Sequence, residues 1–252
     1  MCKKFILSVL CALVFTLISG CSLSYTSDDI ENQPLSTIKN ETINEHVSSI
    51  HFNWLAGDII FYESEDDSIL LIEKATDTFA LENKFTTSFS NETLYIEDYD
   101  KKPLQLSINV NYVLEVYLPQ KEFEEINIQV ESGNITTNNI VSAKNLIIEA
   151  NSANCDINGS FSDILANSVS GNIELTFQNM PEKMSIDGTS SDVSLTFPPN
   201  SGFVLHLDLI SGDFDNVFQT TSKDSNTMIY GNGANDIYVS LVSGDLNIMQ
   251  SK

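Results

Sequence analysis

The sequence predicts an all-β fold, a β-solenoid or single-stranded β-helix in which short strands wind into stacked coils. Three observations support this prediction. A short unit recurs six times, in which a serine is followed by a small residue and then by an amide or a carboxylate. Apolar residues alternate with a period of two around each unit, as expected for half-buried strands. The chain has 252 residues, 42% of them hydrophobic, which is enough to bury one core.

The recurring serines serve as anchors for the repeat. They are separated by 20, 18, 20, 21 and 32 residues, and they are Ser132, Ser152, Ser170, Ser190, Ser211 and Ser243. A period near 20 residues is typical of a solenoid, because one coil cannot bury its apolar faces alone and must stack on its neighbours. The 32-residue interval predicts an excursion near Thr220–Asn226 within one longer coil.

Each turn places an amide or a carboxylate two residues after its anchor. These residues are Asn134, Asn154, Asn172, Asp192, Asp213 and Asp245. We expect each side chain to bond its own backbone and so close its own turn, with a glycine at positive φ beside it. Stacking then aligns the six side chains into a turn ladder. A Ca²⁺ ion between the three C-terminal carboxylates is the alternative interpretation, and no metal site is assigned.

The N-terminus has the features of a bacterial lipoprotein signal peptide, assigned to residues 1–20. Lys3 and Lys4 precede an apolar run, Phe5–Ile18, that is too short for a membrane span. The run closes on a quartet that resembles the lipobox and ends at Cys21, which is therefore expected to carry the lipid. Residues 21–47 are polar and are expected to form a flexible tether. The protein is thus predicted on the extracytoplasmic face of the cell membrane, anchored by more than one acyl chain.

The folded part is assigned to residues 48–252, as one β-solenoid domain. Residues 121–252 hold the regular repeats, whereas residues 48–120 lose the strict period. We expect the irregular part to supply capping strands, because the open end of a repeat stack needs protection. One degenerate copy of the turn is visible there, at Ala56-Gly57-Asp58.

Charge and motifs exclude several functions. The chain has no arginine and 12 lysines against 35 acidic residues, and removal of the signal peptide leaves ten lysines and a net charge of −25. Such a charge repels polyphosphates, so nucleic acid is excluded as a partner. The sequence contains no phosphate-binding loop, nucleophile elbow or H-E-x-x-H motif, and no cofactor or catalytic residue is assigned. Cys155 occupies a position that is apolar in the other repeats, and is expected to be buried.

Several apolar side chains fall on positions that the alternation directs outward. They are Leu165, Val169, Ile210, Tyr238 and Val242. An exposed apolar surface of sufficient size marks an interaction site, so these residues are the candidate binding face. The alternative is that other strands of the domain cover them.

The C-terminal repeats also resemble a known family. Gly231-Asn232-Gly233, followed by the run Asp236–Ile248 with its Ser243-Gly244-Asp245 turn, is similar to the bacterial "putative adhesin" domain family of unknown function, to which the LiaG-like cell-envelope proteins belong. The resemblance covers about Ser48–Lys252. It implies a surface β-solenoid with an adhesive or envelope-sensing role, and it brings no catalytic residues.

These observations predict a lipid-anchored, non-catalytic binding module of the cell surface, adhesin-like or scaffolding in role. Its expected partners are the membrane, through Cys21, and a cell-envelope protein or glycan. Two alternatives remain open at this stage: an accessory sensor of an envelope-stress regulatory system, and a carbohydrate-active β-helix enzyme that uses paired carboxylates.

Overall fold

The computed structural model describes residues 34–76, 85–98, 111–224 and 226–252. The chain divides into Met1–Pro34 and Leu35–Lys252, and the second unit holds every described strand. No helix in the described ranges is long and apolar enough to cross a membrane. The predicted signal peptide, Cys21 and the first part of the predicted tether lie outside the described residues.

The described secondary structure is entirely β, which confirms the predicted class. In chain order the strands are β1 (Ser36–Ile43), β2 (Ser49–Ala56), β3 (Asp58–Glu63), β4 (Ile69–Ala75), β5 (Thr86–Ser90), β6 (Thr93–Glu97), β7 (Tyr112–Leu118), β8 (Glu122–Thr137), β9 (Val141–Ser170), β10 (Ile173–Phe177), β11 (Lys183–Ser190), β12 (Val193–Phe197), β13 (Phe203–Leu209), β14 (Phe214–Asn216), β15 (Thr220–Asp224), β16 (Thr227–Tyr230), β17 (Asn235–Ser243) and β18 (Leu246–Gln250).

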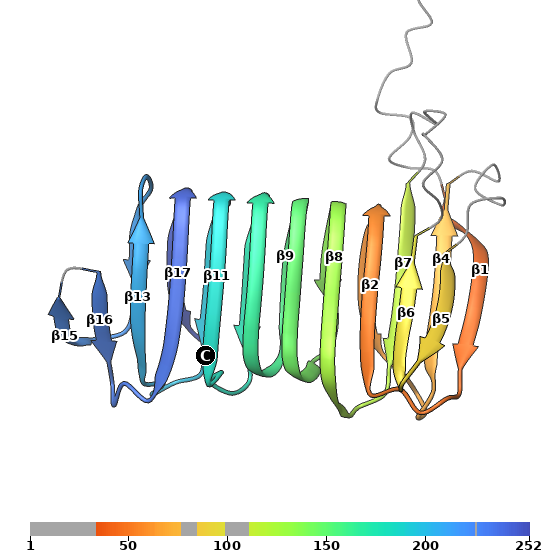
Figure 1. The fold of residues 1–252 in the computed structure, drawn as a ribbon, viewed down its shortest axis with the longest axis horizontal. Coiled ribbons are helices and arrows are strands. Elements are labelled where there is room, and N and C mark those ends of the chain that lie inside the picture. The colour runs from red at the N-terminus through yellow and green to blue at the C-terminus, as the bar shows by residue number, and fades with distance from the viewer. Residues whose placement is uncertain (1–33, 77–84, 99–110, 225) are drawn as a thin grey trace, which may run out of the picture. The chain divides into compact units, whose positions relative to one another are not determined.

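Each regular coil consists of one strand before its turn and one after it. The strands before the turns form a front sheet, built from β2, β8, β9, β11, β17 and β13 (Figure 1). The strands after the turns form a back sheet, built from β3, β8, β9, β10, β12, β18 and β14. Strands β8 and β9 run through their turns and belong to both sheets. Neighbouring coils pair in parallel and in register, so Ile128 lies beside both Phe52 and Ile148. The β-solenoid prediction is confirmed.

Inward side chains form continuous columns between the two sheets. Ile148 and Val239 are buried, and Phe177 stacks on Phe197 with a ring-centroid distance of 5.3 Å. Leu207 is only half-buried, because its coil lies at the end of the stack. Each fully buried large side chain contributes about 1.5–3 kcal/mol, so these columns are the main source of stability.

The spatial order of the last coils differs from their order in the chain. Strand β17 pairs with both β11 and β13, and β18 pairs with both β12 and β14. The C-terminal coil therefore lies between its two predecessors. The predicted excursion near Thr220–Asn226 is a hairpin, β15–β16, whose second strand pairs antiparallel with β13 and covers part of the end coil. It is an end cap, which corrects the expectation of one longer coil.

The N-terminal end begins earlier than expected. Ser36–Ile43 is strand β1, which pairs antiparallel with β4, and Ile38 and Ile43 are buried. The predicted flexible tether over 21–47 is therefore wrong for this segment. Two apolar residues in an eight-residue strand give too weak an alternation to be recognised, and the antiparallel partner supplies the remaining burial.

The irregular N-terminal part consists largely of antiparallel pairs at this end of the stack. Strand β4 pairs antiparallel with β7, and β5 pairs antiparallel with β6. Strands β2 and β3 are an exception within this part, because they form a regular coil in register with β8. The turn at Ala56-Gly57-Asp58 is thus a full member of the repeat.

Candidate functional site: the outer face of the front sheet

The turn ladder forms, but its hydrogen bonds run between coils. The amide nitrogen of Asn134 donates to Asp58 Oδ1 at 2.9 Å, and that of Asn172 donates to Asn154 Oδ1 at 2.9 Å. At the other end, the amide nitrogen of Asp245 donates to Asp192 Oδ1 at 2.9 Å. Asp213 continues the series, because its amide nitrogen donates to Asp245 Oδ1 at 2.8 Å. The expectation that each side chain closes its own turn is wrong for these bonds, since each stabilises the stacking of two coils.

Two turns depart from the glycine pattern in a way that the structure explains. Gly133 and Gly171 have φ of +132° and +116°, and a Cβ on either would overlap a carbonyl oxygen of the preceding coil. Ala153 and Ser191 keep φ out of the left-handed region and turn their side chains inward, where both are buried. The Ser191 hydroxyl there meets that of Ser168 at 2.8 Å.

The ladder offers little to a metal ion. One carboxylate oxygen of Asp192 and one of Asp245 already accept backbone amides. Among the residues that the structure describes, no group of three or more His, Cys, Asp or Glu is arranged to hold a metal ion. The geometry is therefore that of a structural ladder.

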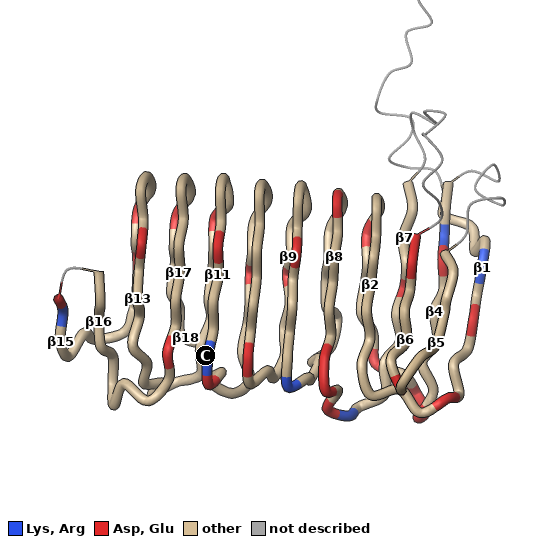
Figure 2. The backbone as a smooth tube through the Cα atoms, viewed as in Figure 1, with Lys and Arg blue, Asp and Glu red and all other residues tan. Residues whose placement is uncertain are grey.

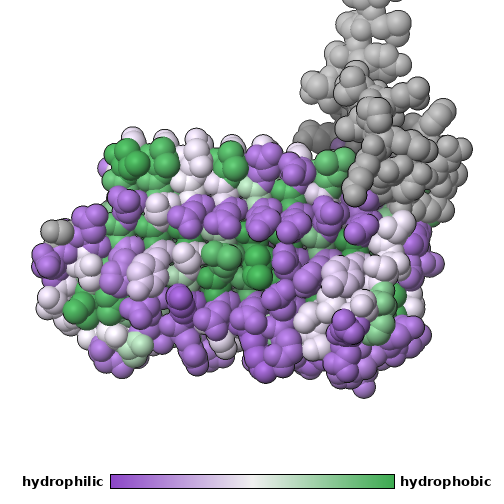
Figure 3. Space-filling view, in the orientation of Figure 1, coloured by the Kyte–Doolittle hydropathy of each residue, from purple (hydrophilic) through white to green (hydrophobic). Residues whose placement is uncertain are grey.

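The five predicted face residues are all exposed, with fractions between 41% and 73%. They fall into two strips rather than one. Val169, Val242 and Ile210 each lie immediately before an anchor serine, and we call them the upper strip. Leu165 and Tyr238 lie four residues further back along their strands, and together with Ile147 they form the lower strip. Green patches in Figure 3 show apolar side chains on this face, separated by hydrophilic ones.

Between the two strips runs a row of polar side chains that sequence reasoning missed. This groove floor takes one residue from each of six neighbouring coils: Asn53, Gln129, Glu149, Asn167, Asp187 and Ser240. They line a groove with a volume of about 590 Å³. The signal was present in the sequence, because the residue three places before each regular anchor is an amide, a carboxylate or a hydroxyl in every coil.

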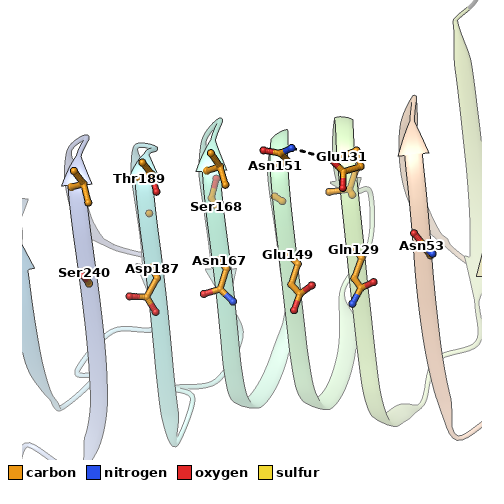
Figure 4. A pocket seen from close by; sticks show the side chains of 15 residues that line it. Asn53, Gln129, Glu131, Glu149, Asn151, Asn167, Ser168, Asp187, Thr189 and Ser240 are labelled. Atoms are coloured by element: carbon orange, nitrogen blue, oxygen red, sulfur yellow. Dashed lines mark hydrogen bonds between the residues drawn. The ribbon is translucent and has the colours of Figure 1, made fainter. Parts of the chain in front are cut away.

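The floor differs from the turn ladder in its hydrogen bonding. Within the described ranges, the six floor side chains make no hydrogen bond to protein, although neighbours in the row are in register. The floor side chains labelled in Figure 4 lie on the outer face of the sheet, and the one bond drawn there, from Asn151 Nδ2 to Glu131 Oε2 at 2.9 Å, lies outside the floor. The donors and acceptors of the floor are therefore available to a ligand.

The electrostatic character of the groove is acidic. Glu131, Glu149 and Asp187 line it, and no lysine does. Figure 2 shows Asp and Glu, without lysine, along the upper half of the front strands. An anionic ligand would meet like charge with no compensating cation, which disfavours its binding.

Two histidines lie on the same outer face, and both have acidic neighbours. His51 Nε2 lies 2.8 Å from Glu125 Oε1, and the His51 ring contacts Tyr95 edge-on. His206 stacks flat on Tyr238, with ring centroids 4.4 Å apart and planes 9° apart, and its Nε2 lies 3.6 Å from Asp236. His206 and Tyr238 also line a smaller cavity of about 270 Å³.

Cys155 is buried in the core, as predicted. Burial disfavours the thiolate and raises the pKa of the Cys155 thiol from 9.0 to about 12. The thiol is thus inert at neutral pH and takes no part in nucleophilic chemistry.

Comparison with known proteins places this geometry in a family. Two matches to one family model cover residues 47–159 and 153–249, which is almost all of the described fold. The chain belongs to the Toastrack DUF4097 family. The resemblance inferred from the C-terminal turns is thereby confirmed.

Two solved structures resemble this chain at low identity. The crystal structure of a "putative cell adhesion protein" from Clostridium sporogenes ATCC 15579 matches with a TM-score of 0.56 and 16% identity, over 86% of this chain and 100% of that one. A "putative adhesin" from Bacteroides fragilis NCTC 9343 matches with a TM-score of 0.49 and 10% identity, over 86% and 98% of the two chains. No curated protein matches the chain in sequence. At 16% identity the first likeness shows a shared fold alone.

Proposed function

We propose that this Toastrack chain is a lipid-anchored, extracytoplasmic binding module without catalytic activity, and that its ligand lies in the groove of the front sheet. The apolar leader that ends at Cys21 supports the location, because lipid chains on that cysteine would hold the domain on the membrane. The name of the Clostridium structure, a "putative cell adhesion protein", is compatible with a binding role.

The groove floor is the observation that carries the proposal. Six coils present polar side chains in one line, and those side chains are left without protein partners in the described ranges. Exposed apolar side chains border the line on both sides at the coils of Asn167 and Ser240, with Val169 and Val242 on one side and Leu165 and Tyr238 on the other. A polar row flanked by apolar strips matches the general anatomy of a binding site, in which a few polar groups fix orientation and apolar surface contributes affinity.

A pull-down of cell-envelope material by the purified chain tests this function. The front variant Glu149→Ala/Asp187→Ala is compared with the back variant Asp156→Ala/Glu174→Ala, which removes one Asp and one Glu from exposed positions of the back sheet. Both variants change the net charge equally. We expect the front variant to lose at least tenfold in bound material and the back variant to bind as the parent chain does. Equal binding by both variants would refute the groove as the site.

The anchor is tested separately. Cys21→Ser removes the sulfur that would carry the lipid, so the variant should leave the membrane fraction and lose incorporation of labelled fatty acid. Retention of the label by Cys21→Ser would contradict lipid attachment at this residue.

A further inference from the structure

A gap interrupts the row of large side chains on the lower strip. His206 and Tyr238 occupy the same register position on neighbouring coils and stack as two flat layers 4.4 Å apart. The next coil places Ser185 at this position, and the coil after it places Leu165. A small side chain thus stands where a third layer of the stack would lie, and we call this place the Ser185 notch.

The notch has room for one flat group. Leu165 and Tyr238 are two coils apart, which corresponds to about 9.6 Å between their strands. A planar group midway between them would contact both, at nearly the spacing that the His206–Tyr238 stack already shows. Two cavities, of about 270 and 430 Å³, meet here, because Ser185 lines both of them. The Ser185 hydroxyl makes no hydrogen bond to protein in the described ranges.

The chemistry of the floor restricts the ligand. Three of its six residues are amides, and an amide side chain both donates and accepts hydrogen bonds. Lysine and arginine side chains only donate, so in a basic peptide the amide donors of Asn53, Gln129 and Asn167 would depend on backbone carbonyls alone for acceptors. Anionic polymers are disfavoured by Glu149 and Asp187. Hydroxyl groups donate and accept, and a neutral polyol therefore matches the floor best.

The periodicity of the floor restricts the shape of the ligand. The row is straight, and its six coils span about 24 Å at roughly 4.8 Å per coil. A β-1,4-linked sugar chain is an extended ribbon whose units advance by a similar distance, whereas α-linked chains tend to coil. The strips lie four residues apart along the strands, about 13 Å, which leaves the width of one such ribbon between them.

We propose that the front groove binds a neutral, β-1,4-linked glycan that carries N-acetylated amino sugars, with one acetamido group in the Ser185 notch. This inference rests on the proposed function and names its ligand class. In such a ribbon the acetamido group projects sideways, with its plane roughly perpendicular to the chain axis. The plane is then parallel to the Tyr238 ring, because that ring stacks along the axis of the coils. The acetamido group completes the interrupted stack, and the Ser185 hydroxyl can donate to its carbonyl oxygen.

Binding of defined oligosaccharides to the full chain, purified in a mild detergent, tests the inference. The probes are β-1,4-linked N-acetylglucosamine oligomers of two to eight units, glucose oligomers with the same linkage, and the deacetylated, cationic glucosamine oligomers. We expect affinity for the acetylated series to rise up to about five units and then level off, following the length of the floor. The glucose series should bind at least tenfold more weakly, because it lacks the acetamido group.

A matched pair of variants isolates the notch. Tyr238→Ala removes the stacking platform of the front sheet. Tyr62→Ala removes a tyrosine of the back sheet that stacks on Tyr117 at 4.9 Å, and it serves as the control. We expect Tyr238→Ala to weaken binding of the acetylated pentamer about tenfold. Tyr62→Ala should leave the affinity unchanged, and circular dichroism verifies that both variants fold.

Three other results would count against the glycan, against the groove ligand being a sugar, or against the notch. In the first, the acetylated oligomers fail to bind although the front variant Glu149→Ala/Asp187→Ala still loses envelope binding. That result would overturn the glycan inference and leave the proposed function standing. Stronger binding of the cationic series, or removal of the envelope ligand by protease, would identify a basic polymer or a protein as the occupant and would also overturn it. Loss of affinity in Tyr62→Ala equal to that in Tyr238→Ala would remove the notch from the site.

Discussion

Replacing Gly133 with alanine is expected to destabilise the coil stack strongly, because the added methyl group strains the backbone and also overlaps the neighbouring coil. Gly133 has a φ of +132°, a region where a residue with a side chain is strained by about 1–3 kcal/mol. The added Cβ would also overlap the carbonyl oxygen of Gly57 on the neighbouring coil. Moving the coils apart there weakens the bond from the Asn134 amide to Asp58, which contributes about 1 kcal/mol. The total is roughly 3 kcal/mol, a large share of a typical domain stability of about 5–15 kcal/mol.

Urea unfolding followed by circular dichroism measures this cost. With a slope of about 2–3 kcal/mol per molar urea, the unfolding midpoint of Gly133→Ala should fall by about 1 M or more. The control is Ala153→Gly, at the equivalent turn of the next coil, where φ lies outside the left-handed region and the side chain is buried. This substitution removes one buried methyl group and gives the unfolded backbone more freedom. Together the two effects should lower the free energy of unfolding by about 1.5 kcal/mol. A midpoint for Gly133→Ala at or above that of Ala153→Gly would refute the reasoning.

Two further predictions concern the core and the coil order. Cys155 should resist thiol reagents in the native chain and react with them in urea. Because the pKa of the Cys155 thiol is raised to about 12 in the folded chain, the thiol of the unfolded chain ionises at a lower pH. The free energy of unfolding should therefore fall between about pH 9 and 12, and Cys155→Ala should lose that part of the pH dependence. In a chain without other cysteines, Ser194→Cys/Asn247→Cys should form a disulfide under mild oxidation, because these residues are in register on β12 and β18. Ser194→Cys/Asp215→Cys should not, since β18 lies between β12 and β14; the reverse result would mean that the coils stack in chain order.

The period-two alternation and the anchor spacing were sufficient to predict the coils and their inward faces. Ile148 and Val239 are buried as expected, since these patterns follow directly from which face of a strand meets the core. The order of the coils could not be predicted in the same way. Every coil presents the same kind of inward set, so the alternation does not distinguish stacking in chain order from the observed order, in which β17 lies between β11 and β13.

The site was predicted only in part. The apolar side chains at outward positions, such as Leu165 and Val242, were found because they break the polar pattern of an exposed face. The groove floor follows that pattern, so its residues looked like ordinary solvated side chains. Their meaning appears only when stacking places Glu149, Asn167 and Asp187 in one line without hydrogen bonds between them. Asp58 was recognised in a degenerate copy of the turn, but its bond to the Asn134 amide, 76 positions away, could not be predicted from the sequence.

Carboxylate footprinting tests the central claim, that ligand binds across the front sheet, most directly and without any substitution. The chain is labelled with a carbodiimide and an amine, free and bound to envelope material, and the modified carboxylates are located by mass spectrometry. All four informative groups are exposed in the free chain: Glu149 and Asp187 on the front sheet, and Asp156 and Glu174 on the back sheet. Protection of the front pair on binding, with unchanged labelling of the back pair, is the expected result. Protection of the back pair, or equal labelling of all four in the bound chain, would contradict the account.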